Sequence, residues 1–169
     1  LVVGPGLKTG LDIRLENPGQ TGADLVVADV AALREHKPPL IIIDMGTATT
    51  VSVIDTDEKY IGTLIIPGMK TSLDALVSGA AQLPKVKLDT PRRVVGTNAA
   101  ESMANGILYY TASGLDGCID RIETELGVEC RVVATGGLAS SVVPLCKKEI
   151  IHDDDLLLKG LMIIYEKNR

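Results

Sequence analysis

Residues 43–50 carry side chains that could bind a phosphate or a cation. Asp44 ends an apolar run, and Gly46 and Thr47 follow it in a turn that is rich in hydroxyl groups. Glycine lets a backbone approach a ligand closely, threonine hydroxyls and turn N–H groups donate to phosphate oxygens, and a carboxylate can hold a cation. A plain β-turn between two hairpin strands explains the same pattern, so these residues alone leave both interpretations open.

Two further segments carry groups that could bind a nucleotide or take part in phosphoryl transfer. Gly136 and Gly137 follow a short apolar run and open a helical pattern, where free N–H groups could face an adenine or ribose; structural turns use the same pair. Asp24 follows Gly22 and Ala23 at the start of another helical pattern. A carboxylate there could accept the proton of a hydroxyl that attacks a γ-phosphate. It could equally cap the helix, for about 0.5–2 kcal/mol, and local evidence alone favours the cap.

The surrounding pattern predicts the elements that position these residues. A strand end at Val2-Val3 and a glycine-rich loop precede a helix over residues 23–35, which Pro38 and Pro39 end. Residues 40–44, 49–55 and 60–66 are β-rich on short connections and predict an antiparallel meander. Helices are expected over 72–83, 98–126 (ended by Gly127), 138–148 and 154–166, with a strand over 131–134.

This order of elements resembles one half of the RNase H-like fold of the actin-like ATPases, which is duplicated around a nucleotide cleft. We therefore expect an α/β chain with a mixed sheet. Residues 39–169 would form a complete RNase H-like domain, and residues 1–38 would be the C-terminal remnant of a preceding similar domain. Because the chain opens at Leu1 without an initiator methionine, we also expect a segment upstream.

The composition of the chain argues against several classes of function. The net charge is −5 and no basic cluster exceeds two neighbours, which argues against a nucleic-acid partner. The longest apolar run, residues 40–43, is far too short to span a membrane, and no targeting signal is visible, so a cytoplasmic location is expected. Cys118, Cys130 and Cys146 lack the spacing of a metal site and are interpreted as reduced thiols.

A family resemblance joins these observations. The chain resembles the type III pantothenate kinases of prokaryotes, which belong to the acetate and sugar kinase/Hsp70/actin superfamily, in the order and spacing of several motifs. The motifs are Gly4-Pro5-Gly6-Leu7-Lys8-Thr9-Gly10, Asn17-Pro18, Gly22-Ala23-Asp24, Asp44-Met45-Gly46-Thr47, Pro67-Gly68, Gly96-Thr97-Asn98 and Thr135-Gly136-Gly137-Leu138. The family's first phosphate motif, Asp-x-Gly-Asn-Thr, is absent from these residues.

The resemblance implies ATP-dependent phosphorylation of pantothenate to 4′-phosphopantothenate, the first step of coenzyme A biosynthesis. It implies that Asp24 accepts the proton, that Asp44 binds potassium or ammonium, and that Thr47 contacts ATP, with magnesium brought by the nucleotide. Pantothenate contacts are implied for Gly22, Ala23 and Thr97, and a homodimer is implied. From the residues themselves, Gly136 and Gly137 join Thr47 as ATP-site candidates. Thr97 could instead be a helix-start hydroxyl, with Asn98 and Glu101 as the cap.

Two positions depart from the family pattern. The family usually has a tyrosine and an arginine that touch pantothenate, where this chain has Leu15 and Leu25. Loss of a charge-assisted contact of about 1.5–3 kcal/mol would weaken substrate binding about 10- to 150-fold. The alternative function is therefore an inactive or regulatory paralogue, a binding protein similar to an accessory transcription factor. Without the first phosphate motif, residues 1–169 alone are expected to be inactive as a kinase.

Overall fold

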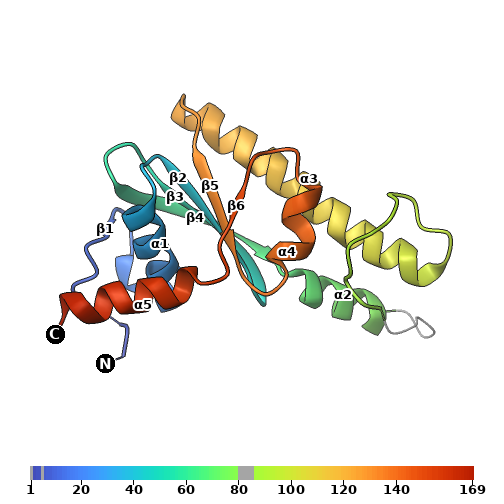
Figure 1. The fold of residues 1–169 in the computed structure, drawn as a ribbon, viewed down its shortest axis with the longest axis horizontal. Coiled ribbons are helices and arrows are strands. Elements are labelled where there is room, and N and C mark those ends of the chain that lie inside the picture. The colour runs from blue at the N-terminus through green and yellow to red at the C-terminus, as the bar shows by residue number, and fades with distance from the viewer. Residues whose placement is uncertain (1, 5, 80–85) are drawn as a thin grey trace.

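The computed structural model describes residues 2–4, 6–79 and 86–169, and it is built around one six-stranded sheet (Figure 1). The strand order is β1-β4-β3-β2-β5-β6. The strands are β1 (Asp12–Ile13), β2 (Leu40–Met45), β3 (Ala48–Ile54), β4 (Lys59–Pro67), β5 (Arg131–Thr135) and β6 (Ile151–His152). The α-helices are α1 (Ala23–Glu35), α2 (Met69–Ser78), α3 (Ala99–Leu126), α4 (Ala139–Val142) and α5 (Leu156–Lys167).

The predicted meander is confirmed. β2 pairs with β3 and β3 with β4 in antiparallel register, while β5 lies parallel to β2 and β6 parallel to β5. Because side chains alternate along a strand, Ile41 and Ile43 face one side of the sheet and Leu40 and Ile42 the other. The sheet is therefore mixed, and its central strand β2 is buried on both faces, as the apolar character of residues 40–43 requires.

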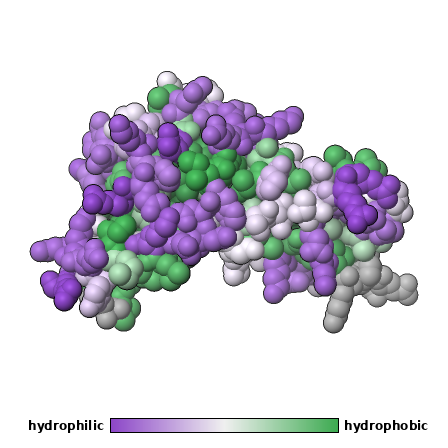
Figure 2. Space-filling model, viewed as in Figure 1, coloured by the Kyte–Doolittle hydropathy of each residue, from purple (hydrophilic) through white to green (hydrophobic). Residues whose placement is uncertain are grey.

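Helices cover the two faces unequally. α3 packs on one face through Leu108, Leu115 and Ile119. α1 and α5 pack together on the other face, against Leu40 and Ile42 (Figure 1). Exposed apolar side chains remain on the outer face of α5, where Figure 2 shows apolar surface. They are Leu158, Leu161, Met162 and Tyr165.

α3 has the caps that its sequence predicted. Asn98 Oδ1 accepts from the N–H of Glu101 at 2.9 Å, and Gly127 ends the helix in the left-handed conformation, with φ of 68°. No helix in the described part of the chain is long and apolar enough to cross a bilayer.

Three local predictions need correction, and two short strands were not predicted. Residues 2 and 3 form no strand, and the short strands β1 and β6 were missed. The helix expected over 72–83 begins earlier, at Met69, and ends at Ser78; residues 80–83 lie outside the described residues. The helix expected over 138–148 is wrong beyond α4, because the chain tightens into a 3₁₀ turn, Val143–Leu145, that contains Pro144.

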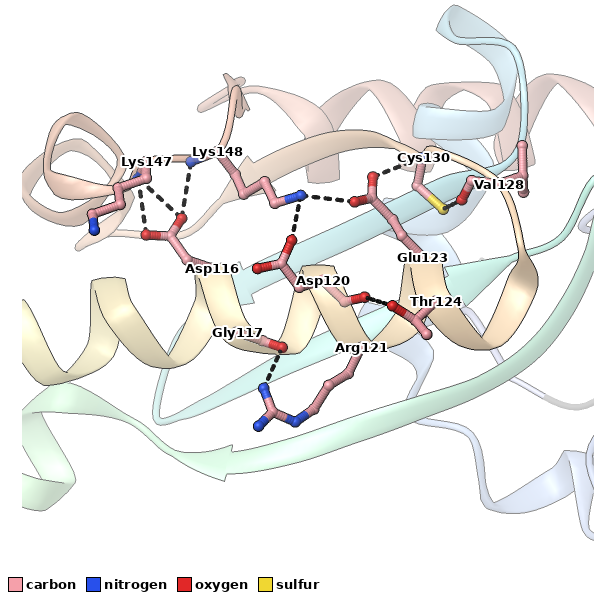
Figure 3. Close-up of polar contacts among 10 residues, drawn as sticks. All are labelled: Asp116, Gly117, Asp120, Arg121, Glu123, Thr124, Val128, Cys130, Lys147 and Lys148. Carbon is pink, nitrogen blue, oxygen red and sulfur yellow. Dashed lines mark hydrogen bonds and ion pairs between the residues drawn. The ribbon is translucent and has the colours of Figure 1, made fainter.

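A polar clip on α3 holds the chain that follows this turn (Figure 3). The Asp116 carboxylate accepts the N–H groups of Lys147 and Lys148 at 2.9–3.0 Å. The Lys148 ammonium pairs with Asp120 at 2.6 Å and with Glu123 at 2.8 Å. The Asp116 bonds satisfy backbone N–H groups that a longer helix would have paired internally.

The contact between α1 and α5 depends on one glycine. A Cβ at Gly160 would lie 2.0 Å from the Val27 carbonyl oxygen. We expect Gly160→Ala to lower the free energy of unfolding in urea by at least about 1–3 kcal/mol, because neither backbone can yield easily. Gly106→Ala on α3 is the matched control, since its Cβ would meet nothing within 4 Å. Equal effects of the two substitutions would contradict the close packing.

Candidate active site

The turn between β2 and β3 is the centre of the candidate site. It begins at the end of β2, where Asp44 and Met45 are followed by Gly46 and Thr47. The Thr47 carbonyl oxygen accepts the N–H of Gly68 at 3.1 Å and the Thr71 hydroxyl at 2.8 Å. The start of α2 is thereby tied to the turn, and Thr47 itself stays exposed.

Two other segments approach this turn through glycine. A Cβ at Gly68 would lie 2.3 Å from the Thr47 carbonyl oxygen. Gly136 has φ of 101°, and a Cβ there would lie 2.6 Å from the Met45 nitrogen and oxygen. Gly137 is exposed, with open space where its Cβ would point. The structure therefore brings Thr47, Gly136 and Gly137, which were predicted separately, to one turn.

A pocket of about 490 Å³ lies between the start of α1 and strands β3 and β4. Four predicted site residues line it, namely Leu15, Gly22, Asp24 and Leu25. Thr50, Tyr60 and Thr63 line it too; Thr50 belongs to the segment 43–50 but was given no role of its own, and sequence reasoning did not assign Tyr60 or Thr63 to the site. The meander contained a usable signal for Thr50, because this residue follows the predicted turn by only three positions.

Asp24 lies in the first turn of α1 and is exposed. Gly22 occupies the N-cap position, so Asp24 is not the N-cap residue. The Asp24 carboxylate accepts the N–H of Leu25 at 3.0 Å. Its Oδ1 would lie only 2.5 Å from a Cβ at Gly22, so the absence of a side chain there makes room for the carboxylate. An exposed carboxylate at a pocket wall is available to accept a proton.

Asp44 is half-buried, and its pKa is raised by desolvation and by the nearby charge of Asp24. A cation beside Asp44 would oppose both effects, since it favours the charged carboxylate. Within the described residues, no three His, Cys, Asp or Glu side chains gather closely enough to form a metal site on their own. Asp44 would thus need backbone, hydroxyl or ligand oxygens as co-ligands.

Thr97 and Ala23 lie elsewhere. The backbone N–H and hydroxyl of Thr97 donate to Glu101 at 3.0 and 3.1 Å, at the start of α3, and Thr97 is not among the residues that line the pocket. The start of α3 lies far from α1 across the molecule (Figure 1). Ala23 faces a neighbouring pocket of about 500 Å³ that the N-terminal loop lines. Within one chain, Thr97 therefore acts at the helix start, beside the predicted cap formed by Asn98 and Glu101.

The family model and the similar proteins found by comparison carry the same family name. Residues 1–121 match a family model described as type III pantothenate kinase. A protein of that name from an Exiguobacterium species is 44% identical over 169 residues, which are 100% of this chain and 66% of the relative. Another, from Halalkalibacterium halodurans, is 42% identical over 168 residues, 99% of this chain and 66% of the relative. The chain thus spans about two thirds of the length of these relatives.

The fold has a solved counterpart. A Campylobacter jejuni protein, described as belonging to a Baf family of transcriptional activators, has a TM-score of 0.60 and 18% identity, covering 94% of this chain and 68% of that one. At 18% identity this likeness shows a shared fold and nothing about function. The mixed α/β sheet and this counterpart agree with the RNase H-like fold expected from the order of elements.

The glycine pair at the turn provides a matched test of the geometry. We expect Gly136→Ala to lower the free energy of unfolding by at least about 1–3 kcal/mol, because a side chain is strained at that φ and collides with Met45. Gly137→Ala should change it by no more than about 0.5 kcal/mol, since the added methyl meets open space. Urea unfolding of both variants measures the difference, and a Gly136→Ala variant as stable as the parent would contradict the contact.

Proposed function

The chain belongs to the type III pantothenate kinase family, and on that premise we propose that it forms the larger part of an enzyme that phosphorylates pantothenate with ATP. The reaction would be the first step of coenzyme A biosynthesis. The observation that carries the proposal is the pocket at the start of α1, which gathers Asp24 and three other predicted substrate residues. Asp44 lies close enough for the charge of Asp24 to raise its pKa.

In the proposed reaction the substrate hydroxyl attacks the γ-phosphorus of ATP, its proton passes to Asp24, and ADP leaves. Thr47 and the backbone of Gly136 and Gly137 would hold the nucleotide, which brings Mg²⁺ with it. Asp44 would bind K⁺ or NH₄⁺. Positioning of the two reactants would supply most of the rate enhancement, as is usual in phosphoryl transfer, while Asp24 adds a smaller general-base term.

Leu15 and Leu25 support a second candidate, an inactive or regulatory paralogue that binds a ligand without turnover. The pocket residues that the structure describes include the acids Glu16 and Asp24 and no lysine or arginine. A carboxylate-bearing substrate would therefore find no charge-assisted partner among them. Turnover by the completed protein decides between the two candidates.

The arrangement of the whole protein is also part of the proposal. We expect residues 1–38 to complete a preceding domain and residues 39–169 to form the second RNase H-like domain, in a cytoplasmic homodimer. Thr97 would reach the substrate pocket of the partner subunit, because it lies away from the pocket of its own chain. Tyr110, which is 82% exposed on α3, would lie at the subunit contact, whereas Leu108 on the same helix is buried in the core.

The function is tested with the chain alone and with the chain joined to the additional third of the Exiguobacterium relative. We expect no measurable phosphorylation of pantothenate by residues 1–169, and turnover by the joined protein. Asp24→Asn in the joined protein should lower turnover at least about 10²-fold, through loss of the base. Asp74→Asn, an exposed change on α2, is the control. Full turnover with Asp24→Asn would remove this residue from the mechanism.

The cation assignment has its own test in the same joined protein. Replacing Na⁺ with K⁺ or NH₄⁺ should raise turnover, because an oxygen-lined site with one carboxylate suits a large monovalent ion. Asp44→Asn should abolish the difference between the salts. Equal rates in Na⁺ and K⁺ for the unmodified protein would contradict a role for Asp44 as the ligand of that cation.

A further inference from the structure

α1 buries a carboxyl group that the proposed reaction does not use. Asp29 has no solvent exposure, and neither of its carboxyl oxygens has a hydrogen-bond partner. Its neighbours along the helix, residues 25–28 and 30–32, are all apolar and buried. An isolated ionised carboxylate is very costly in such surroundings, so the group must either find a partner or keep its proton.

Two buried hydroxyls lie next to this carboxyl group. Ser52 on β3 and Tyr60 on β4 are almost fully buried, and their oxygens also lack partners. Burial raises the pKa of Asp29 well above its ordinary value, and the nearby Ser52 hydroxyl offsets only part of this effect. Burial also raises the pKa of Tyr60, which the same Ser52 hydroxyl lowers in part. Ser52 therefore lies near both groups, although no hydrogen bond joins the three in the structure.

The charged groups around Asp29 do not supply a counter-ion. Asp44 on β2 raises the pKa of Asp29 further, and β3 and β4 contribute the neutral Ser52 and Tyr60. From α5, Lys159 pairs with Glu35 at 3.0 Å and with Asp153 at 2.6 Å. Glu35 is six residues beyond Asp29, about 9 Å farther along the helix axis. The neutral acid is the form that these surroundings favour.

The location of this cluster connects it with the pocket. Asp24 is on the same helix as Asp29, in its first turn. Tyr60 lines the pocket together with Thr50 and Thr63, and Ser52 is paired with Thr63 across the two strands. A hydrogen bond from Asp29 to Ser52 would therefore join the helix that carries Asp24 to the strands that form the pocket floor.

We propose that Asp29 is a positioning residue. As a neutral carboxylic acid it donates a hydrogen bond to Ser52 and so fixes α1 against β3 and β4, the strands that form the floor of the pocket. A protonated carboxyl has one donor, and a serine hydroxyl can accept that bond while it donates its own proton to Tyr60. The assignment rests on the proposed function only where it names Asp24 as the group that is positioned. The proton on Asp29 can be tested without any kinase assay.

The test compares unfolding of residues 1–169 with that of Asp29→Asn between pH 4.5 and 8.5. In the unfolded chain the carboxyl ionises near its ordinary pKa of about 3.9, whereas the folded chain keeps the proton to a higher pH. Folding then takes up a proton, so the folding equilibrium constant should fall about tenfold per pH unit until the folded pKa is reached. Asn cannot ionise, so this component should be missing, and Asp29→Asn should gain stability relative to the parent as the pH rises.

Asp74→Asn on α2 is the matched control and should leave the pH dependence of the parent unchanged. Amide hydrogen exchange at residues 26–29, measured at pH 5, reports whether the start of α1 is held, because Val26 is the first α1 residue whose N–H bonds to a backbone carbonyl. It should be slow in the parent and in Asp29→Asn, whose side-chain amide can also donate to Ser52. It should be at least about tenfold faster in Asp29→Ala and Ser52→Ala.

Three results would overturn the proposal. Parallel pH curves for the parent and Asp29→Asn would mean that the carboxyl holds no proton above its ordinary range. Stability that rises with pH, and with added KCl only when Asp29 is present, would mean that the carboxylate is ionised and holds a cation. Unchanged exchange in Asp29→Ala and Ser52→Ala would remove the positioning role, whatever the kinase assay shows.

Discussion

The turn at residues 45–47 is the constraint on which the site depends, because two distant segments reach its backbone only where glycine leaves room. Gly68 brings the start of α2 to the Thr47 carbonyl, and Gly136 brings the end of β5 to Met45. Any side chain at either position would push the segments apart. The packing of backbone on backbone thus fixes the relative positions of three loops that separate stretches of sequence provide.

The pocket depends on a different kind of contact. α1 packs against both the sheet and α5, so its position is set by the apolar residues of β2 and by the close approach that Gly160 allows. Asp24 gains its place at the pocket wall from this packing, not from any bond of its own carboxylate to the sheet. Small changes in the packing of α1 would consequently move the proposed base.

Buried polar groups without hydrogen-bond partners gather on the pocket side of the sheet. On the pocket side, Asp29, Ser52 and Tyr60 are buried without hydrogen-bond partners. Asp44 is half-buried there, and its charge raises the pKa of Asp29. On the α3 side, the cluster around Leu108, Leu115 and Ile119 is apolar, and the Thr49 hydroxyl is buried nearby without a partner. Such unsatisfied polar groups cost stability, and they concentrate where a fold binds and reacts with ligands.

The sequence by itself determined the meander, the bounds of α1, the caps of α3 and the identity of the candidate site residues, because periodicity, glycine and capping patterns are local. Only the tertiary structure decided that Leu15, Gly22, Asp24 and Leu25 share a pocket with Thr50, and that Thr97 lies apart from it. The burial of Asp29 was likewise decided by long-range contacts. Local pattern cannot reveal these features, because each depends on residues that are distant in the chain and meet only when the sheet has formed.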